Sequence, residues 1–150
     1  MRKLSLTVAM LSVLAFHAQA ADVTFTKDVM PIVQENCVVC HRPDGQNIAG
    51  MVAPFSLMTY EEARPWANAI ERVVANKEMP PWYASDHTKG VFRNERGLTD
   101  DQIETIVTWV NSGARRGNPN DAPAPVEFED TGGWIIGKPD LVVRIPEPFL

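Results

Sequence analysis

Apolar residues recur at helical spacing in three separate segments of the chain. The first spans about residues 27 to 37, where Ile32 and Val33 follow Val29 at distances of three and four positions. Thr26 precedes this segment and is the expected N-cap of its helix. The pattern predicts a helix that ends at the two cysteines of the chain.

The second segment begins with a capping box. Thr59 and Glu62 have the spacing at which each side chain bonds the backbone N–H of the other residue. Pro65 suits the first turn of a helix that follows a short turn. Apolar residues then fall at i, i+3, i+4, i+7 and i+8: Trp66, Ala69, Ile70, Val73 and Val74. The pattern predicts a helix with one apolar face.

The third segment gives the clearest helical signal. Thr99 and Gln102 form a second capping box, and Gly113 is placed to end the helix as its C′ residue. The expected buried stripe consists of Ile103, Ile106, Val107 and Val110.

The C-terminal part of the chain has a different character. Residues 118–133 are rich in proline and acidic side chains and are expected to form a linker. Residues 134–150 read as an extended tail with a short β-branched strand at 141–145. The sequence as a whole predicts a small all-α domain of about three main helices over residues 21–117.

The N-terminus is typical of a secretory signal peptide. Two basic residues precede an apolar run over 4–16, and Ala18-Gln19-Ala20 is an A-x-A cleavage site. A membrane anchor is the alternative, but the run is too short to span a bilayer comfortably. We therefore expect residues 1–20 to be removed, a periplasmic or otherwise exported protein, and no stable membrane insertion afterwards.

The charge of the chain excludes one class of partner. The 14 basic and 19 acidic residues give a net charge of −5, and loss of Arg2 and Lys3 leaves 12 basic residues against 19 acidic ones, or −7. No basic patch remains for nucleic acid. An acidic protein is steered toward basic surfaces.

The sequence Cys37-Val38-Val39-Cys40-His41 is the strongest chemical signal. C-x-x-C-H is the attachment motif of c-type haem. Two cysteines at this spacing reach the two vinyl groups of one porphyrin, and the following histidine can bind the iron. The motif predicts one covalent haem c.

Two other interpretations of the cysteines fit less well. A thioredoxin-like dithiol requires a strand before the motif and a βαβ pattern around it, whereas helical signals surround Cys37 and Cys40. Structural zinc requires four ligands. Adjacent Cys40 and His41 cannot easily reach one tetrahedral ion, and His87 is the only other histidine after the signal peptide.

The haem iron also needs a sixth ligand or an open face. Met79 is the preferred ligand because two prolines follow it and stiffen its backbone, and a thioether opposite histidine suits electron transfer. Met30 lies too close to the motif to cross the ring, and Met51 and Met58 lie in the loop before the second helix. His87 is the rival ligand, and a solvated loop histidine is its simpler interpretation.

Residues 22–117 resemble a class I cytochrome c domain. The features that carry the resemblance are the helix running into "CVVCH", the Met-Pro loop and the closing helix "LTDDQIETIVTWVNSGA". More narrowly, "FTKDVMPIVQENCVVCHRP", "APFSLMTYEEARPWANAI", "KEMPPW" and "GWIIGKPDLVV" resemble a bacterial family. In that family, such a domain precedes a copper type II, ascorbate-dependent monooxygenase-like domain.

The resemblance implies a role for each site residue. Cys37 and Cys40 are the thioether positions, His41 is the proximal ligand, and Met79 is the distal ligand. The carbonyl of Pro54 is expected to accept a hydrogen bond from the other nitrogen of His41. By the narrower resemblance, residues 134–150 begin a copper domain that the chain does not complete.

Other residues are candidates for the haem surroundings. Trp66 and Trp109 are expected in the core or the haem wall, and Trp82 near the ring edge. Arg64 and Arg72 could pair with haem propionates, although a solvated helix face explains them equally well.

The sequence thus predicts a periplasmic c-type cytochrome, not an enzyme, that exchanges single electrons with a redox protein donor and acceptor. The alternatives are a haem enzyme or sensor with an open sixth site, and an electron-feeding part of a larger copper oxidoreductase.

Overall fold

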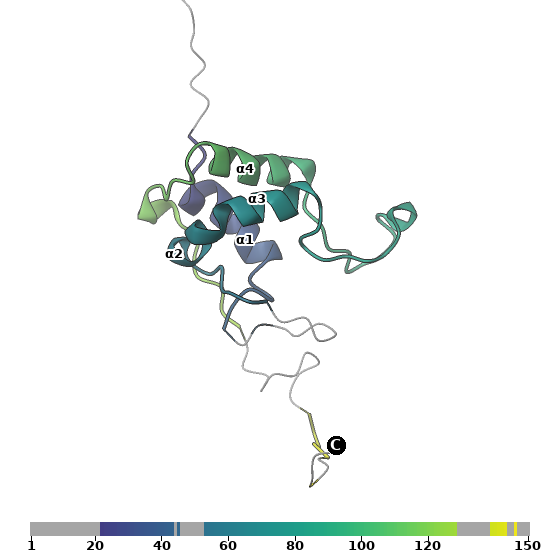
Figure 1. Cartoon of the computed structure of the whole chain (residues 1–150). Helices are drawn as coiled ribbons and strands as arrows, with labels where there is room; N and C mark the ends of the chain where they lie inside the picture. The colour runs from purple at the N-terminus through teal and green to yellow at the C-terminus, as the bar shows by residue number, and fades with distance from the viewer. Residues whose placement is uncertain (1–21, 44, 46–52, 129–138, 144–145, 147–150) are drawn as a thin grey trace, which may run out of the picture.

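The computed structural model describes residues 22–43, 45, 53–128, 139–143 and 146. These residues form helices and loops and contain no β-strand. The helices lie against one another in one body, from which the segment after α3 projects as a long arm (Figure 1). The expected all-α fold is therefore confirmed.

The N-terminal helix is longer than its sequence pattern predicts. It begins as a π-helix, η1 (Phe25–Val29), and continues as α1 (Met30–Asn36). Its N-cap is Thr24 and not Thr26, and the backbone N–H of Thr24 donates to the Asp28 carboxylate at 2.7 Å. Thr26 is instead buried, and its hydroxyl donates to the carbonyl oxygen of Arg116 at 3.0 Å.

The second helical run contains both predicted features at its start. The capping box of Thr59 and Glu62 opens α2 (Tyr60–Ala63), and Pro65 lies in the following 3₁₀ turn η2 (Arg64–Trp66). The helix α3 (Ala67–Ala75) continues from there. Trp66 thus precedes α3, and it is exposed, unlike the buried face of that helix.

The last long helix, α4 (Asp100–Asn111), begins and ends as predicted, but Trp109 is buried in its core-facing side and Val107 is not. The capping box of Thr99 and Gln102 opens it, and Gly113 follows it with a φ of 98°. This left-handed conformation favours glycine and ends the helix. The helix packs along α3 (Figure 1).

The core lies where η1 meets α4. Phe25 and Trp109 are almost completely buried, with ring centroids 5.5 Å apart, and the Trp109 indole N–H donates to the carbonyl oxygen of Arg115 at 2.9 Å. The backbone N–H groups of Phe25 and Thr26 donate to the carbonyl oxygens of Arg115 and Arg116. These bonds join the two ends of the helical body. Trp109 is accordingly a core residue.

The segment after α4 contacts this body over residues 118–128. It contains a short 3₁₀ turn, η4 (Pro119–Asp121), and the side-chain amide of Gln34 donates to the carbonyl oxygen of Ala124 at 3.2 Å. The guanidinium of Arg42 lies 3.6 Å from the ring centroid of Phe128. The chain therefore returns from the end of α4 to the residue that follows His41.

The expected strand at 141–145 is not formed in its described part. Residues 141–143 have no regular secondary structure, because the described chain offers no second strand to pair with them. Residues 144–145, the expected signal peptide and Met51 lie outside the described residues. In the described part of the chain, no helix has the length and apolar character needed to cross a bilayer.

Candidate functional site

The attachment motif forms a tight turn at the end of α1. Cys37 is the C-cap of this helix, and the N–H groups of Cys40 and His41 both donate to its carbonyl oxygen, at 3.1 and 2.9 Å. Cys37 and Cys40 are free thiols. The turn places both sulfur atoms and the imidazole at one cavity.

That cavity has a volume of about 340 Å³ and mainly apolar walls. The attachment turn forms one side, and α3 and the loop before α2 form others. The apolar lining side chains are Ala53, Pro54, Phe55, Leu57, Trp66, Ala69, Ile70, Val73, Val74, Met79, Pro80, Pro81 and Leu98. Such walls suit a large apolar ring. The two cysteine side chains line the same cavity. The residues present therefore fit haem c.

The proximal histidine is held by a backbone carbonyl. Nδ1 of His41 lies 3.1 Å from the carbonyl oxygen of Phe55, which can only accept, so Nδ1 carries the proton. Nε2 is then free to bind a metal. The expected partner was the carbonyl of Pro54, and this expectation is wrong by one residue. The N–H of Leu57 donates to the carbonyl of His41 at 2.9 Å and sets this register.

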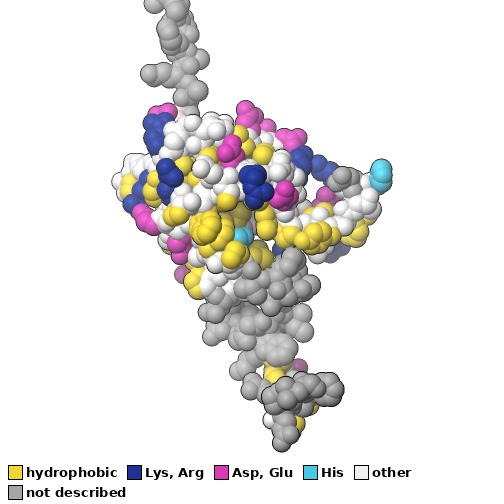
Figure 2. Space-filling model, in the orientation of Figure 1, with side chains coloured by type: hydrophobic (Ala, Val, Ile, Leu, Met, Phe, Trp, Pro, Cys, Tyr) yellow, Lys and Arg dark blue, Asp and Glu magenta, His cyan; other side chains and the backbone are white. Residues whose placement is uncertain are grey.

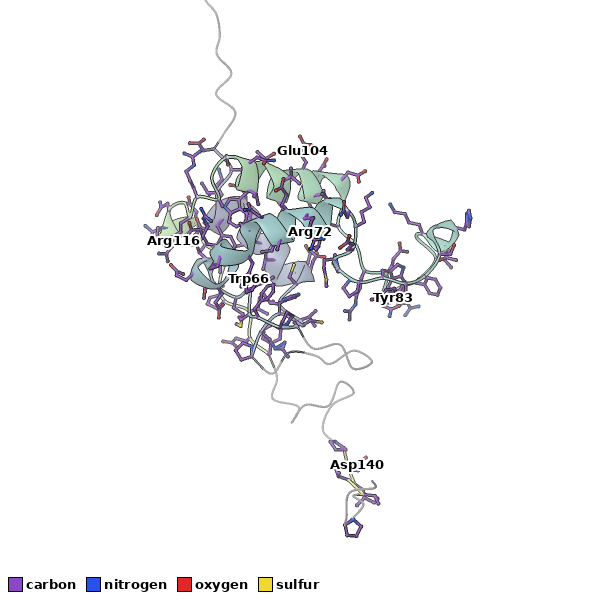
Figure 3. The ribbon with its side chains drawn as sticks, viewed as in Figure 1. Trp66, Arg72, Tyr83, Glu104, Arg116 and Asp140 are labelled. Carbon is purple, nitrogen blue, oxygen red and sulfur yellow. The ribbon has the colours of Figure 1, made fainter. Side chains whose placement is uncertain are left out.

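Aromatic rings build the wall beside His41. The ring of Phe55 lies 5.2 Å from the imidazole and stacks on Trp66, with centroids 4.3 Å apart and planes 5° from parallel. Trp66 lines the cavity while 43% of its surface remains exposed. Figure 3 shows Trp66 on the lower side of the helical body. Trp66 is thus a wall residue of the cavity.

Met79 lines the same cavity from the segment after α3. The N–H groups of Glu78 and Met79 both donate to the carbonyl oxygen of Val73, so this segment is tied to the helix end. The side chains of Met30 and Met58 instead pack against the hydrophobic core. Of the three described methionines, Met79 alone lines this cavity.

His87 does not line the cavity. It belongs to the short turn η3 (Asp86–Thr88) on the projecting arm, and it is exposed. Trp82 does not line the cavity either. It borders a smaller hollow of about 140 Å³ and packs edge-on against Phe92 at 5.6 Å.

The protonation of Cys37 argues against dithiol chemistry. Burial, and then the neighbouring Cys40, raise the pKa of the Cys37 thiol to about 12. A thiol with this pKa is protonated at neutral pH, whereas disulfide exchange requires the thiolate. Within the described residues, no group of three metal-ligating His, Cys, Asp or Glu side chains comes together. This leaves the zinc interpretation without support there.

Two arginines stand at the cavity, and sequence reasoning identified only one of them. Arg72 lines the cavity and pairs with Glu78 at 3.5 Å, whereas Arg64 does not line it and donates to the carbonyl oxygen of Gly113. Arg96 was missed. Its Nη1 lies 4.0 Å from the sulfur of Cys40. No local signal identifies a residue that follows Cys40 by 56 positions.

Comparison with known protein families agrees with this geometry. The family model described as Cytochrome c matches residues 29–114, which is more than half of the chain. Comparisons with curated proteins and with solved structures gave no match.

Proposed function

The chain belongs to the cytochrome c family, and from this premise we propose that it is an exported electron carrier with His41 and Met79 as the axial ligands of its haem. Family membership implies covalently bound haem c and electron transfer by that haem. Bound haem c supplies a one-electron Fe(II)/Fe(III) couple.

One observation carries the ligand proposal: Cys37, Cys40, His41 and Met79 all line the same cavity. The Phe55 carbonyl engages Nδ1 of His41, so Nε2 is the nitrogen that would bind a metal. The apolar walls would limit water around a bound ring and would favour its less charged, reduced state. A thioether ligand raises the potential further.

The ligand pair can be tested by absorption from the visible to the near-infrared on haem-loaded protein. The ferric wild type is expected to show a sulfur-to-iron band, and Met79→Ala is expected to lose it and to lower the midpoint potential. Met58→Ala is the matched control, because Met58 packs against the core. If Met79→Ala leaves the band and the potential unchanged, Met79 is not the ligand and another sulfur binds the iron. If the ferric wild type lacks the band, the haem enzyme or sensor with an open site becomes the better proposal.

We also infer export, on the strength of the signal-peptide pattern in residues 1–20. The C-x-x-C-H motif is consistent with export as well. Mass spectrometry of protein purified from a periplasmic fraction is expected to give a chain that begins at Ala21 or Asp22. An intact Met1 would contradict export with cleavage.

The narrower resemblance supports a further proposal, that this haem domain feeds electrons to a copper domain behind it. Residues 118–128 return to the body, and Phe128 lies against Arg42, next to the haem attachment turn. Sequencing of the reading frame past Leu150 tests this proposal. An immediate stop codon counts against a copper domain in the same chain.

A further inference from the structure

The turn that ends α3 leads directly to Met79. The N–H of Lys77 donates to the carbonyl oxygen of Val74 at 3.0 Å. The N–H groups of Glu78 and Met79 donate to the carbonyl oxygen of Val73 at 2.8 and 3.1 Å. The bonds of Lys77 and Glu78 are the pair that defines a Schellman motif. The backbone of the proposed ligand is therefore fixed by this turn.

Lys77 occupies the left-handed position of the turn, with a φ of 57°. Glycine is the usual residue at this position, because a Cβ strains the left-handed conformation. The lysine side chain supplies a contact that glycine could not. Its Nζ lies 3.2 Å from Oδ1 of Asp100, the first residue of α4. This ion pair connects the turn before Met79 to the start of another helix.

A second ion pair lies within the turn itself. Arg72 of α3 lies 3.5 Å from Glu78, and the side-chain amide of Asn76 donates to the same carboxylate at 3.2 Å. Figure 2 shows basic and acidic side chains close together on this part of the body, where Figure 3 labels Arg72. Both contacts join residues that are close in sequence. The pair of Lys77 and Asp100 differs, because it ties the turn to α4.

The side chain of Met79 borders space on two sides, so its position depends on this turn. Met79 lines the haem cavity, and it also lines the hollow of about 140 Å³ at the base of the arm. Lys77 and Ile103 of α4 border the same hollow. The backbone before Met79 therefore decides how firmly its sulfur is held at the cavity.

We propose that Lys77 and Asp100 are positioning residues, whose ion pair holds Met79 on the haem iron and keeps the sixth coordination position closed to external ligands. This inference rests on the proposed function, because it takes Met79 as the ligand. Without the pair, the turn moves away from α4 more often and the thioether leaves the iron more often. An external nitrogen ligand then takes its place, with no change in oxidation state. Both side chains are largely exposed, so the pair is weak and sensitive to salt.

Imidazole binding to the ferric, haem-loaded chain tests the proposal by stopped flow. At saturating imidazole, the observed rate equals the rate at which Met79 leaves the iron, and loss of the sulfur-to-iron band reports it. Lys77→Ala keeps a Cβ in the left-handed turn but removes the ion pair, and Asp100→Asn removes the pair from the other side. Each variant is expected to raise the limiting rate about threefold, as suits an exposed ion pair. The double variant is expected to be no faster than either single variant, because all three lose the same contact.

Two further variants separate positioning from a general contribution to stability. The side chains of Glu71 and Asn111 also join α3 to α4, at 3.2 Å, but at the opposite end of α4 from Asp100. Glu71→Ala is therefore the matched control and is expected to leave the limiting rate unchanged. Lys77→Arg keeps the charge and is expected to restore the wild-type rate. Added salt is expected to accelerate imidazole binding in the wild type and to have little effect in Lys77→Ala.

Unchanged limiting rates in Lys77→Ala and Asp100→Asn overturn the proposal, even if denaturant unfolding shows that both variants have lost stability. An equal acceleration in Glu71→Ala overturns it as well, because the effect would then not depend on the contact beside Met79. A ferric wild type that lacks the sulfur-to-iron band contradicts the proposed function instead, so the two failures are distinguishable.

Discussion

Nδ1 of His41 lies 3.1 Å from the carbonyl oxygen of Phe55, and the same residue turns its ring toward the imidazole. The backbone of Phe55 thus fixes the tautomer of the proposed iron ligand, while its side chain forms part of the cavity wall. The stack with Trp66 holds the ring in place. One residue of the loop before α2 therefore controls both the orientation of His41 and the shape of its surroundings.

The ring of Phe55 is expected to contribute more to stability than to ligation. Phe55→Ala keeps the backbone carbonyl but removes the contacts with His41 and Trp66, so it is expected to lower the free energy of unfolding by about 2–3 kcal/mol. Phe55→Leu retains much of the side-chain volume, so its loss in the free energy of unfolding is expected to be about half that of Phe55→Ala. Denaturant unfolding of the haem-loaded variants measures both losses. Equal stability of Phe55→Ala and wild type would show that the stack contributes nothing.

Local signals predicted the helices and the attachment turn because their physics is local. The capping boxes at Thr59 and Thr99 involve residues three positions apart, and C-x-x-C-H lies within a single turn. The π-helical start of the first helix escaped prediction. It depends on hydrogen bonds from Phe25 and Thr26 to residues 115 and 116, which no periodicity reveals.

The surroundings of the site were harder to predict than the site residues themselves. The Phe55 carbonyl was missed by one position, since the bond from Leu57 to His41 sets the loop register. Arg96 reaches Cys40 only through the path of the arm. Such contacts arise from tertiary packing, and the sequence around each residue does not encode them.

Gly117 is expected to be the glycine most sensitive to substitution near the ends of the helical body. Its φ is 88°, and an added Cβ would lie 2.6 Å from the side-chain atoms of Thr24 and Thr26. Gly117→Ala is therefore expected to combine a backbone cost of about 1 kcal/mol with a steric clash that disturbs the crossing of the two ends. Thermal unfolding of the haem-loaded protein measures the loss.

Gly113 offers a matched control for this clash. It also has a positive φ, of 98°, but an added Cβ would meet no atom within 4 Å. Gly113→Ala is expected to cost only the backbone term of about 1 kcal/mol. If the two variants lose the same stability, the contacts of Gly117 with Thr24 and Thr26 do not limit that position.

The N-terminal cap of α4 is expected to contribute measurably to stability. The Thr99 side chain accepts a hydrogen bond from the backbone N–H of Gln102 at 3.2 Å. Thr99→Ala removes this acceptor and is expected to cost about 1 kcal/mol, whereas Thr99→Ser keeps it. Thr108→Ala, at an exposed position in the last turn of the same helix, is expected to be neutral or slightly stabilising because alanine has the higher helix propensity. Chemical denaturation compares the three variants, and a Thr99→Ala loss no larger than that of Thr99→Ser contradicts the capping argument.

Arg96 is expected to raise the midpoint potential of the haem. Its guanidinium lies 4.0 Å from the sulfur of Cys40, at the edge where the proposed thioether forms. A positive charge there destabilises ferric iron more than ferrous iron, because the ferric state carries one more positive charge. Arg96→Gln is therefore expected to lower the potential by a few tens of millivolts, or about 1 kcal/mol, on the scale of a partly exposed charge pair. Spectroelectrochemical titration at fixed ionic strength measures the change.

Two variants show whether this effect comes from the charge beside Cys40. Arg96→Lys keeps the charge and is expected to restore most of the potential, while Arg93→Gln removes an exposed charge from the arm at a position that does not line the cavity. We expect Arg93→Gln to shift the potential much less than Arg96→Gln, because solvent and salt screen the more distant charge. The sulfur-to-iron band is expected to persist in Arg96→Gln, Arg96→Lys and Arg93→Gln, because none of them replaces a proposed ligand. An unchanged or higher potential in Arg96→Gln would show that the charge of Arg96 does not act on the haem.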